Sequence, residues 1–153
     1  MHPFKKILVP VDFSSDSARA VRMAMELALR YDAALTLIHV YEPVAYALPD
    51  GHTFFTQPQL DELFVEFRKY LDAIQAEAKA GGVARVETRL EQGFAASQIC
   101  ESAEQMGCDL IVMGTHGRTG LSHLFLGSVA ERVLRMAPCP VLTVKTKDRE
   151  LKA

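Results

Sequence analysis

DLIVMGTHG, residues 109–117, predicts a buried strand that runs into a loop. Its apolar run, Leu110–Met113, has the length and composition of a strand that is covered on both faces. Glycines and small polar residues follow, and a helical pattern resumes at Val129. A strand, a glycine-bearing loop and a helix start in this order suit a phosphate group, because backbone N–H groups can approach the anion closely.

Segments on both sides of this stretch alternate between strand and helix patterns. In the third predicted strand, Ala84–Leu90, apolar and polar residues alternate, which indicates that this strand lies near an edge of the sheet. Five strands with four helices between them predict one parallel α/β sheet. The predicted strands are Ile7–Val11, Ala34–Val40, Ala84–Leu90, Leu110–Met113 and Val141–Val144, and the predicted helices cover about 15–31, 60–78, 95–106 and 129–137.

The apolar positions of each helix predict which face it buries. The stripe on the second helix, from Leu60 to Ala78, is the strongest in the chain. Residues 41–57 have no periodicity, are punctuated by prolines, and carry Tyr46, Phe54 and Phe55, so they predict a surface insertion or a functional loop. Predicted inward positions on the other helices are Ala18, Val21, Met25 and Ala28, then Ile99 and Ala103, then Val129, Val133 and Met136.

Composition limits the classes of function. A chain of 153 residues predicts a single domain over 1–153. The net charge of −2 gives no basic field for nucleic acid or for an anionic membrane. Neither a signal-peptide layout nor an apolar run of about 20 residues is visible. We therefore expect a cytoplasmic protein that binds neither nucleic acid nor membrane.

Cysteines and histidines do not form a metal motif. Cys100, Cys108 and Cys139 are odd in number and contain no C-x-x-C pair, so we interpret them as buried thiols. His116 and His123 lie seven residues apart without a third ligand at metal spacing. The sequence therefore predicts neither a disulfide framework nor a structural metal.

Glycine spacing separates the loop from the common nucleotide motifs. Gly114-x2-Gly117-x9-Gly127-Ser128 is neither a Walker A loop nor a Rossmann fingerprint. It resembles the nucleotide-binding signature of the universal stress protein family. The opening segment Ile7–Ser14 and the closing segment Cys139–Val144 resemble that family as well, so the resemblance spans almost the whole chain.

The resemblance implies a Rossmann-like sheet, similar to that of the adenine nucleotide alpha hydrolases, with strand order 3-2-1-4-5 and helices on both faces. Ligands in such sheets bind where the strand order reverses, here between the first and fourth strands. The resemblance further implies ATP, bound with or without Mg²⁺, and a homodimer that pairs through Val141–Val144. The family acts in stress tolerance or regulation.

Two sets of residues are predicted to meet in this crevice. Asp12 would take a ribose hydroxyl or a phosphate-bound cation, or else cap the following helix. For the base, the family positions match Pro10, Val11 and Val40, and Met113 is either a further wall or ordinary core. The predicted phosphate side is Gly114, His116, Gly117, Arg118, Gly127, Ser128 and Val129.

Alternatives remain open for several of these residues. Gly114 and Gly127 would serve only turns and helix capping if no phosphate binds, and Arg118 would then be a solvated surface residue. A nucleotide-free dimeric scaffold is the alternative function. An ATP-using enzyme and a phospho-acceptor domain are weaker, because neither a Ser-Gly-Gly-x-Asp-Ser loop nor a second acid beside Asp12 is present. Without a P-loop lysine or a base for water, we expect at most slow ATP hydrolysis.

Overall fold

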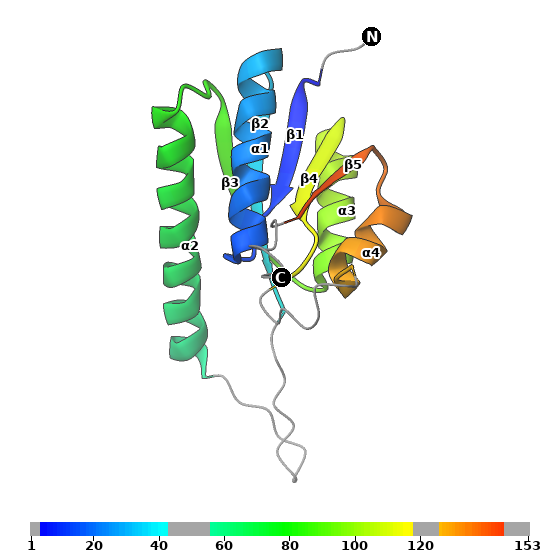
Figure 1. Ribbon diagram of the computed structural model, residues 1–153. Coiled ribbons are helices and arrows are strands. Elements are labelled where there is room, and N and C mark those ends of the chain that lie inside the picture. The colour runs from blue at the N-terminus through cyan, green and yellow to red at the C-terminus, as the bar shows by residue number, and fades with distance from the viewer. Residues whose placement is uncertain (1–3, 43–55, 118–125, 146–153) are drawn as a thin grey trace, which may run out of the picture.

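Five parallel strands form one sheet in the order β3-β2-β1-β4-β5 (Figure 1). The computed structural model describes residues 4–42, 56–117 and 126–145. Both the parallel α/β class and the strand order implied by the resemblance are therefore confirmed. The strands are β1 (Lys6–Pro10), β2 (Ala34–Tyr41), β3 (Val86–Gln92), β4 (Leu110–Gly114) and β5 (Val141–Val144).

Helices cover both faces of the sheet. Figure 1 shows α1 and α2 on one face and α3 and α4 on the other. Successive strands are parallel, so the chain must cross back to the end of the sheet at which each strand begins. These four helices form the crossover connections. The helices are α1 (Ser15–Tyr31), α2 (Gln57–Ala80), α3 (Ala95–Met106) and α4 (Ser128–Met136).

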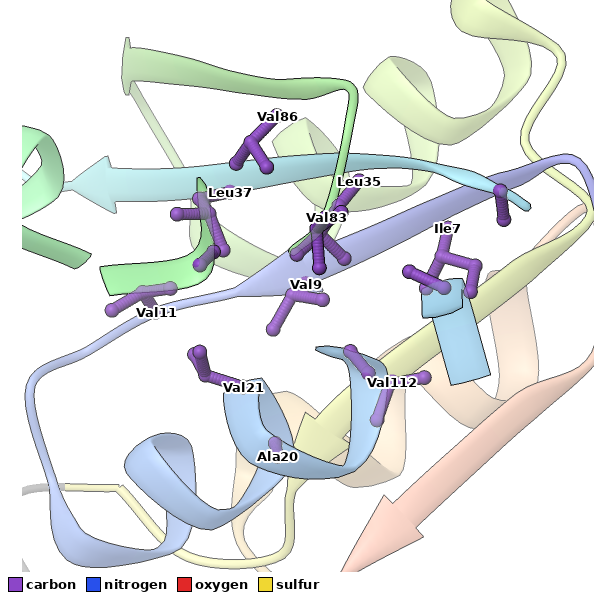
Figure 2. Close-up of a cluster of buried hydrophobic side chains, with 14 of the residues drawn as sticks. Ile7, Val9, Val11, Ala20, Val21, Leu35, Leu37, Val83, Val86 and Val112 are labelled. Carbon is purple, nitrogen blue, oxygen red and sulfur yellow. The ribbon is translucent and has the colours of Figure 1, made fainter. Parts of the chain in front are cut away.

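Alternate residues of the central strands supply two separate apolar clusters. On β1, Ile7 and Val9 join the cluster under α1 and α2, whereas Leu8 joins the cluster under α3 and α4. Figure 2 shows the first cluster, in which Val21 of α1 lies beside Val9. Burial on both faces explains why these strands are almost wholly apolar in sequence.

Two of the helices end at glycine residues. Gly107 caps α3 with φ of 61°, a left-handed conformation that glycine adopts without the steric cost of a Cβ. Gly81 is the C-cap residue of α2. Both helices therefore end at a glycine.

Some predicted details are wrong. β3 is displaced by two residues from the prediction: it begins at Val86, opposite Leu35, and continues to Gln92, which pairs with Tyr41. β1 begins at Lys6 and ends at Pro10, although the N–H of Val11 still donates to the carbonyl oxygen of Ile38 at 2.8 Å. Most of the predicted 41–57 loop, including Tyr46, Phe54 and Phe55, lies outside the described residues.

The buried faces of two helices also differ from the prediction. Ala18 on α1 is exposed, and Ala20 and Ala24 are buried beside Val21 and Ala28 instead. On α4, Val133 is buried as predicted. Val129 and Met136, however, are exposed, and Ala130 takes the second buried position.

Candidate functional site

A pocket lies beyond the carboxyl ends of β1 and β4, where the strand order reverses. Its volume is about 190 Å³, and one side is open to solvent. Pockets that enclose drug-sized ligands have roughly 300–1,000 Å³, so a ligand of that size would fill this one and extend through its open side. Every predicted site residue within the described part of the chain lines it: Pro10, Val11, Asp12, Val40, Met113, Gly114, His116, Gly117, Gly127, Ser128 and Val129.

Some lining residues were not predicted, and one predicted residue is not described. Ala95 and Ile99 of α3 close the apolar side, although the sequence suggested only a core role for Ile99. Arg118 lies outside the described residues. The other lining residues that the sequence did not indicate are Ser17, Ile38, Thr115 and Ala130.

One side of the pocket is apolar and the other is polar. Val40 and Met113 contribute apolar surface from β2 and β4, and Met113 also belongs to the cluster under α3 and α4. Met113 is therefore both core and pocket wall. On the opposite side, small and polar residues come from the loops that follow β1 and β4.

Asp12 holds the start of α1 and also faces the loop after β4. Its Oδ1 accepts from the backbone N–H of Ser14 at 3.0 Å and from the Ser14 hydroxyl. Ser14 is the N-cap residue of α1, and its hydroxyl accepts from the N–H of Ser17. The other oxygen, Oδ2, would lie 3.2 Å from a Cβ on Gly117. Asp12 thus supports the cap without being the cap residue, and one oxygen remains directed at the loop.

Two glycines of the motif, Gly114 and Gly127, allow close backbone contacts. A Cβ on Gly114 would lie 2.8 Å from the Cβ of Asp16 and 3.0 Å from the backbone nitrogen of Ser17. A Cβ on Gly127 would lie 2.9 Å from the carbonyl oxygen of Thr115. The first contact packs the end of β4 against α1, and the second packs the start of α4 against the loop after β4. Both positions therefore have a structural role, as the alternative interpretation proposed, while still lining the pocket.

The N-terminus of α4 presents backbone donors to the pocket. Gly127 is its N-cap residue, and its carbonyl oxygen accepts the first intrahelical bond, from Glu131, at 2.9 Å. The N–H groups of the three residues between them have no intrahelical acceptor, as at the start of any α-helix. All three residues, Ser128, Val129 and Ala130, line the pocket. This end of the helix also carries a partial positive charge, which favours an anion.

Asp16 is a further residue of this region that the sequence did not indicate as part of the site. It lies in the first turn of α1 and is 6% exposed. Its Oδ2 accepts from the Thr115 hydroxyl at 3.0 Å and from the backbone N–H of His116 at 3.2 Å. His116 Nδ1 lies 3.2 Å from the same oxygen. No local signal connects residues that are 99 and 100 positions apart.

His39 packs in an aromatic cluster next to the pocket. Its Nδ1 donates to the carbonyl oxygen of Val11 at 2.6 Å, and its ring centroid lies 4.4 Å from that of Phe67 and 4.7 Å from that of Phe13. Phe13, directly after Asp12, has φ of 64°, which is rare for a bulky residue. Within the described ranges no group of three potential ligands is arranged to hold a metal ion, and His123 lies outside them.

Cys108 and Cys139 precede β4 and β5, at the end of these strands opposite the pocket, and Cys100 lies on α3. Burial raises the pKa of the Cys108 thiol to about 11, and the Coulomb interaction with Cys139 adds to the rise. Burial also raises the pKa of Cys100 and of Cys139. Because the thiolate is the reactive form, these groups are poor nucleophiles at neutral pH.

Together these features define a doubly wound α/β domain with a ligand pocket at its topological switch point. The chain belongs to the universal stress protein family, whose model matches residues 3–145. No helix in the described segments is both long and apolar enough to cross a membrane.

Individual relatives support the same assignment. The universal stress protein MJ0531 of Methanocaldococcus jannaschii is 39% identical over 149 residues, which cover 96% of this chain and 85% of the relative. The solved structure of UspA from Lactobacillus plantarum has a TM-score of 0.81 at 28% identity and covers 94% of this chain and 99% of that one. A universal stress protein in complex with cAMP has a TM-score of 0.71 at 26% identity, covering 94% and 98%.

Proposed function

We propose that this chain is an ATP-binding universal stress protein, a small cytoplasmic module that acts in stress response or regulation. The single observation that carries the proposal is the pocket at the switch point, where an apolar wall faces the N-terminal donors of α4. The relative in complex with cAMP adds support for an adenine nucleotide.

The adenine and ribose are assigned to the β1 and β2 side. A flat base needs apolar surface, which Pro10, Val11, Val40 and Met113 provide. Asp12 would accept from a ribose hydroxyl through Oδ2, the oxygen that does not accept from Ser14. A carboxylate accepts strongly from such a hydroxyl, so Asp12 would orient the sugar.

The phosphates are assigned to the α4 side. Gly117 and Gly127 leave room for the anion, and Ser128 and Val129 supply backbone N–H groups at the helix start. The Ser128 hydroxyl, His116 and Arg118 are proposed as further donors. Mg²⁺ would accompany the phosphates, and hydrolysis would be slow because no lysine or base for water is assigned here.

A homodimer through β5 is also proposed. Within the described residues β5 pairs with β4 along one edge only, and an apolar strand edge favours pairing with another chain. Leu142 on β5 is 38% exposed, and Leu134 and Met136 of the adjacent helix α4 are about half exposed. These side chains would be covered in the dimer.

Calorimetric titration with ATP and Mg²⁺ tests the proposal, after denaturation and refolding have removed any nucleotide retained from expression. We expect micromolar binding that the double variant Gly117→Val, Gly127→Val loses while circular dichroism stays native. Ala73→Val, Ala76→Val on the exposed side of α2 is the matched control, because it adds the same side chains away from the pocket. Native protein that binds no nucleotide would support the dimeric scaffold instead.

A further inference from the structure

The first turn of α1 connects the two loops that form the pocket. Ser17 Oγ accepts from the backbone N–H of Asp12 at 3.2 Å, which ties this turn to the loop after β1. Asp16 Oδ2 accepts from Thr115 and His116, which ties the same turn to the loop after β4. Two successive residues of one helix therefore set the separation between the two sides of the pocket.

Asp16 itself stands behind the pocket wall. Thr115 and His116 line the pocket, whereas Asp16 does not. A carboxylate can only accept, so the contact with Asp16 Oδ2 places the proton of His116 on Nδ1. Thr115 Oγ1, 2.9 Å from the same nitrogen, belongs to this group of contacts. The tautomer and the orientation of the ring are thereby fixed from behind.

Close packing leaves Asp16 little freedom to move. The position of a Cβ on Gly114 would overlap the Cβ of Asp16, at 2.8 Å, and its carbonyl carbon, at 2.9 Å. The glycine at the end of β4 thus lets the first turn of α1 approach the loop directly. The loop in turn contacts α4, because the N–H of Gly127 donates to the carbonyl oxygen of Thr115 at 2.8 Å.

We propose that Asp16 is a positioning residue that makes the site selective for ligands carrying phosphate. It holds the Thr115–Gly117 loop, and through Thr115 the start of α4, where the phosphates are assigned. The base wall at Pro10 and Val40 comes from β1 and β2, whereas Asp16 accepts from Thr115 and His116 in the loop after β4. The inference rests on the proposed function and goes beyond it by naming what shapes the phosphate side.

Its test compares ATP with adenosine as two calorimetric ligands for the full chain. In Asp16→Ala we expect ATP affinity to fall by about tenfold or more, the scale of a lost hydrogen bond to a charged group, while adenosine affinity changes by less than about threefold. Asp16→Asn keeps an acceptor oxygen, so its ATP affinity should stay within about threefold of the native value. Glu26→Ala, which removes an exposed carboxylate from the same helix, is the control and should change neither.

A second readout follows the His116 ring by nitrogen NMR, with His116→Gln used to assign its signals. The native protein should show a proton on Nδ1, and Asp16→Ala should lose that preference while Asp16→Asn retains it. If Asp16→Ala does not fold, Asp16→Ser replaces it, since serine leaves a polar atom in the buried position. We expect the same larger loss of affinity for ATP than for adenosine.

Equal losses of ATP and adenosine affinity, or unchanged ATP affinity in Asp16→Ala, would overturn the inference. Native protein that binds neither ligand is a different result, because it overturns the proposed function itself.

Discussion

The backbone N–H of Gly127 donates to the carbonyl oxygen of Thr115 at 2.8 Å, which joins the start of α4 to the loop after β4. This contact places the donors of α4 beside Gly117, so the two parts of the glycine motif meet in space. Gly117 and Gly127 therefore lie close together, although nine positions separate them in the sequence.

Gly127→Ala is expected to weaken ATP binding more than it weakens the fold. The new Cβ would lie 2.9 Å from the carbonyl oxygen of Thr115, so the start of α4 must shift away from the loop. Calorimetry with ATP should show a loss of about tenfold, because a small displacement of donors costs about one hydrogen bond. Equal ATP affinity in the native protein and the variant would contradict this prediction.

Gly114→Ala is expected to act mainly on stability. Its Cβ would meet the backbone of α1 at Asp16 and Ser17, and neither contact can be relieved by rotating a side chain. We expect a loss of roughly 1–3 kcal/mol in the free energy of unfolding by urea, as for other overpacked sites. Gly117→Ala is the matched comparison, because its Cβ meets only the side-chain oxygen of Asp12, and it should unfold near the native midpoint.

Leu71→Ala is expected to destabilise the domain by roughly 2–5 kcal/mol, since it opens a cavity under α2. Leu71 is completely buried, whereas Leu29 on α1 is about half exposed. Leu29→Ala, the same chemical change, should stay within about 1 kcal/mol of the native protein. Urea unfolding of both variants measures the difference, and equal losses would contradict the assigned burial.

Leu142→Lys is expected to convert the proposed dimer to a monomer. A lysine on an edge strand opposes pairing with another strand, and here it would enter the centre of the interface. Size exclusion with light scattering measures the change. Val65→Lys, which replaces a more exposed apolar residue on α2, should leave the dimer intact. Native protein that is already monomeric would reject the β5 interface.

Cys108 should make the protein less stable as the pH rises above about 9. The thiol has an ordinary pKa of 9.0 in the unfolded chain and a pKa of about 11 in the fold, where burial opposes ionisation. Between these values the unfolded state has released a proton that the folded state keeps, so unfolding becomes easier as pH rises. The stabilisation is complete below about pH 9 and is lost by about pH 11.

Urea unfolding at several pH values checks this dependence. Cys108→Ala should show a smaller decrease in stability across the same range, although Cys100 and Cys139 would still contribute. An identical pH profile for the native protein and Cys108→Ala would contradict the prediction.

The strands could be predicted because burial on both faces requires nearly continuous apolar runs. Leu110–Met113 is such a run, and every residue in it is buried. With the strand order that the family resemblance implies, the rule for ligand sites in parallel sheets indicates that Asp12 and Gly114 meet in one crevice. Their common pocket is therefore the part of the site that the sequence determined best.

Helix faces were harder to predict where alanine occurs around the whole helix. In α1, Ala20, Ala24 and Ala28 lie on one face and Ala18 lies on another, and the small apolar surface of alanine distinguishes these faces only weakly. Ala18 is exposed and the others are buried. Which alanines are buried depends on how α1 lies on the sheet, and the local sequence does not encode this.

Asp16 could not be recognised, because its partners at Thr115 and His116 are brought to it only by the packing of α1 against β4. Likewise, Ala95 enters the pocket because of the position of α3, while its own sequence context suggests only a helix start. Both residues join the site through tertiary contacts that the local sequence does not encode.

The pairing of Ile7 with Leu110 has a consequence for synthesis of the chain. β1 can pair with β4 only after a segment more than a hundred residues downstream has been made. The crevice between these two strands therefore cannot form on a ribosome that has made only the first half of the protein. The crevice would then bind its ligand only after the fourth strand has been made, and a truncated product that ends before that strand would not bind it.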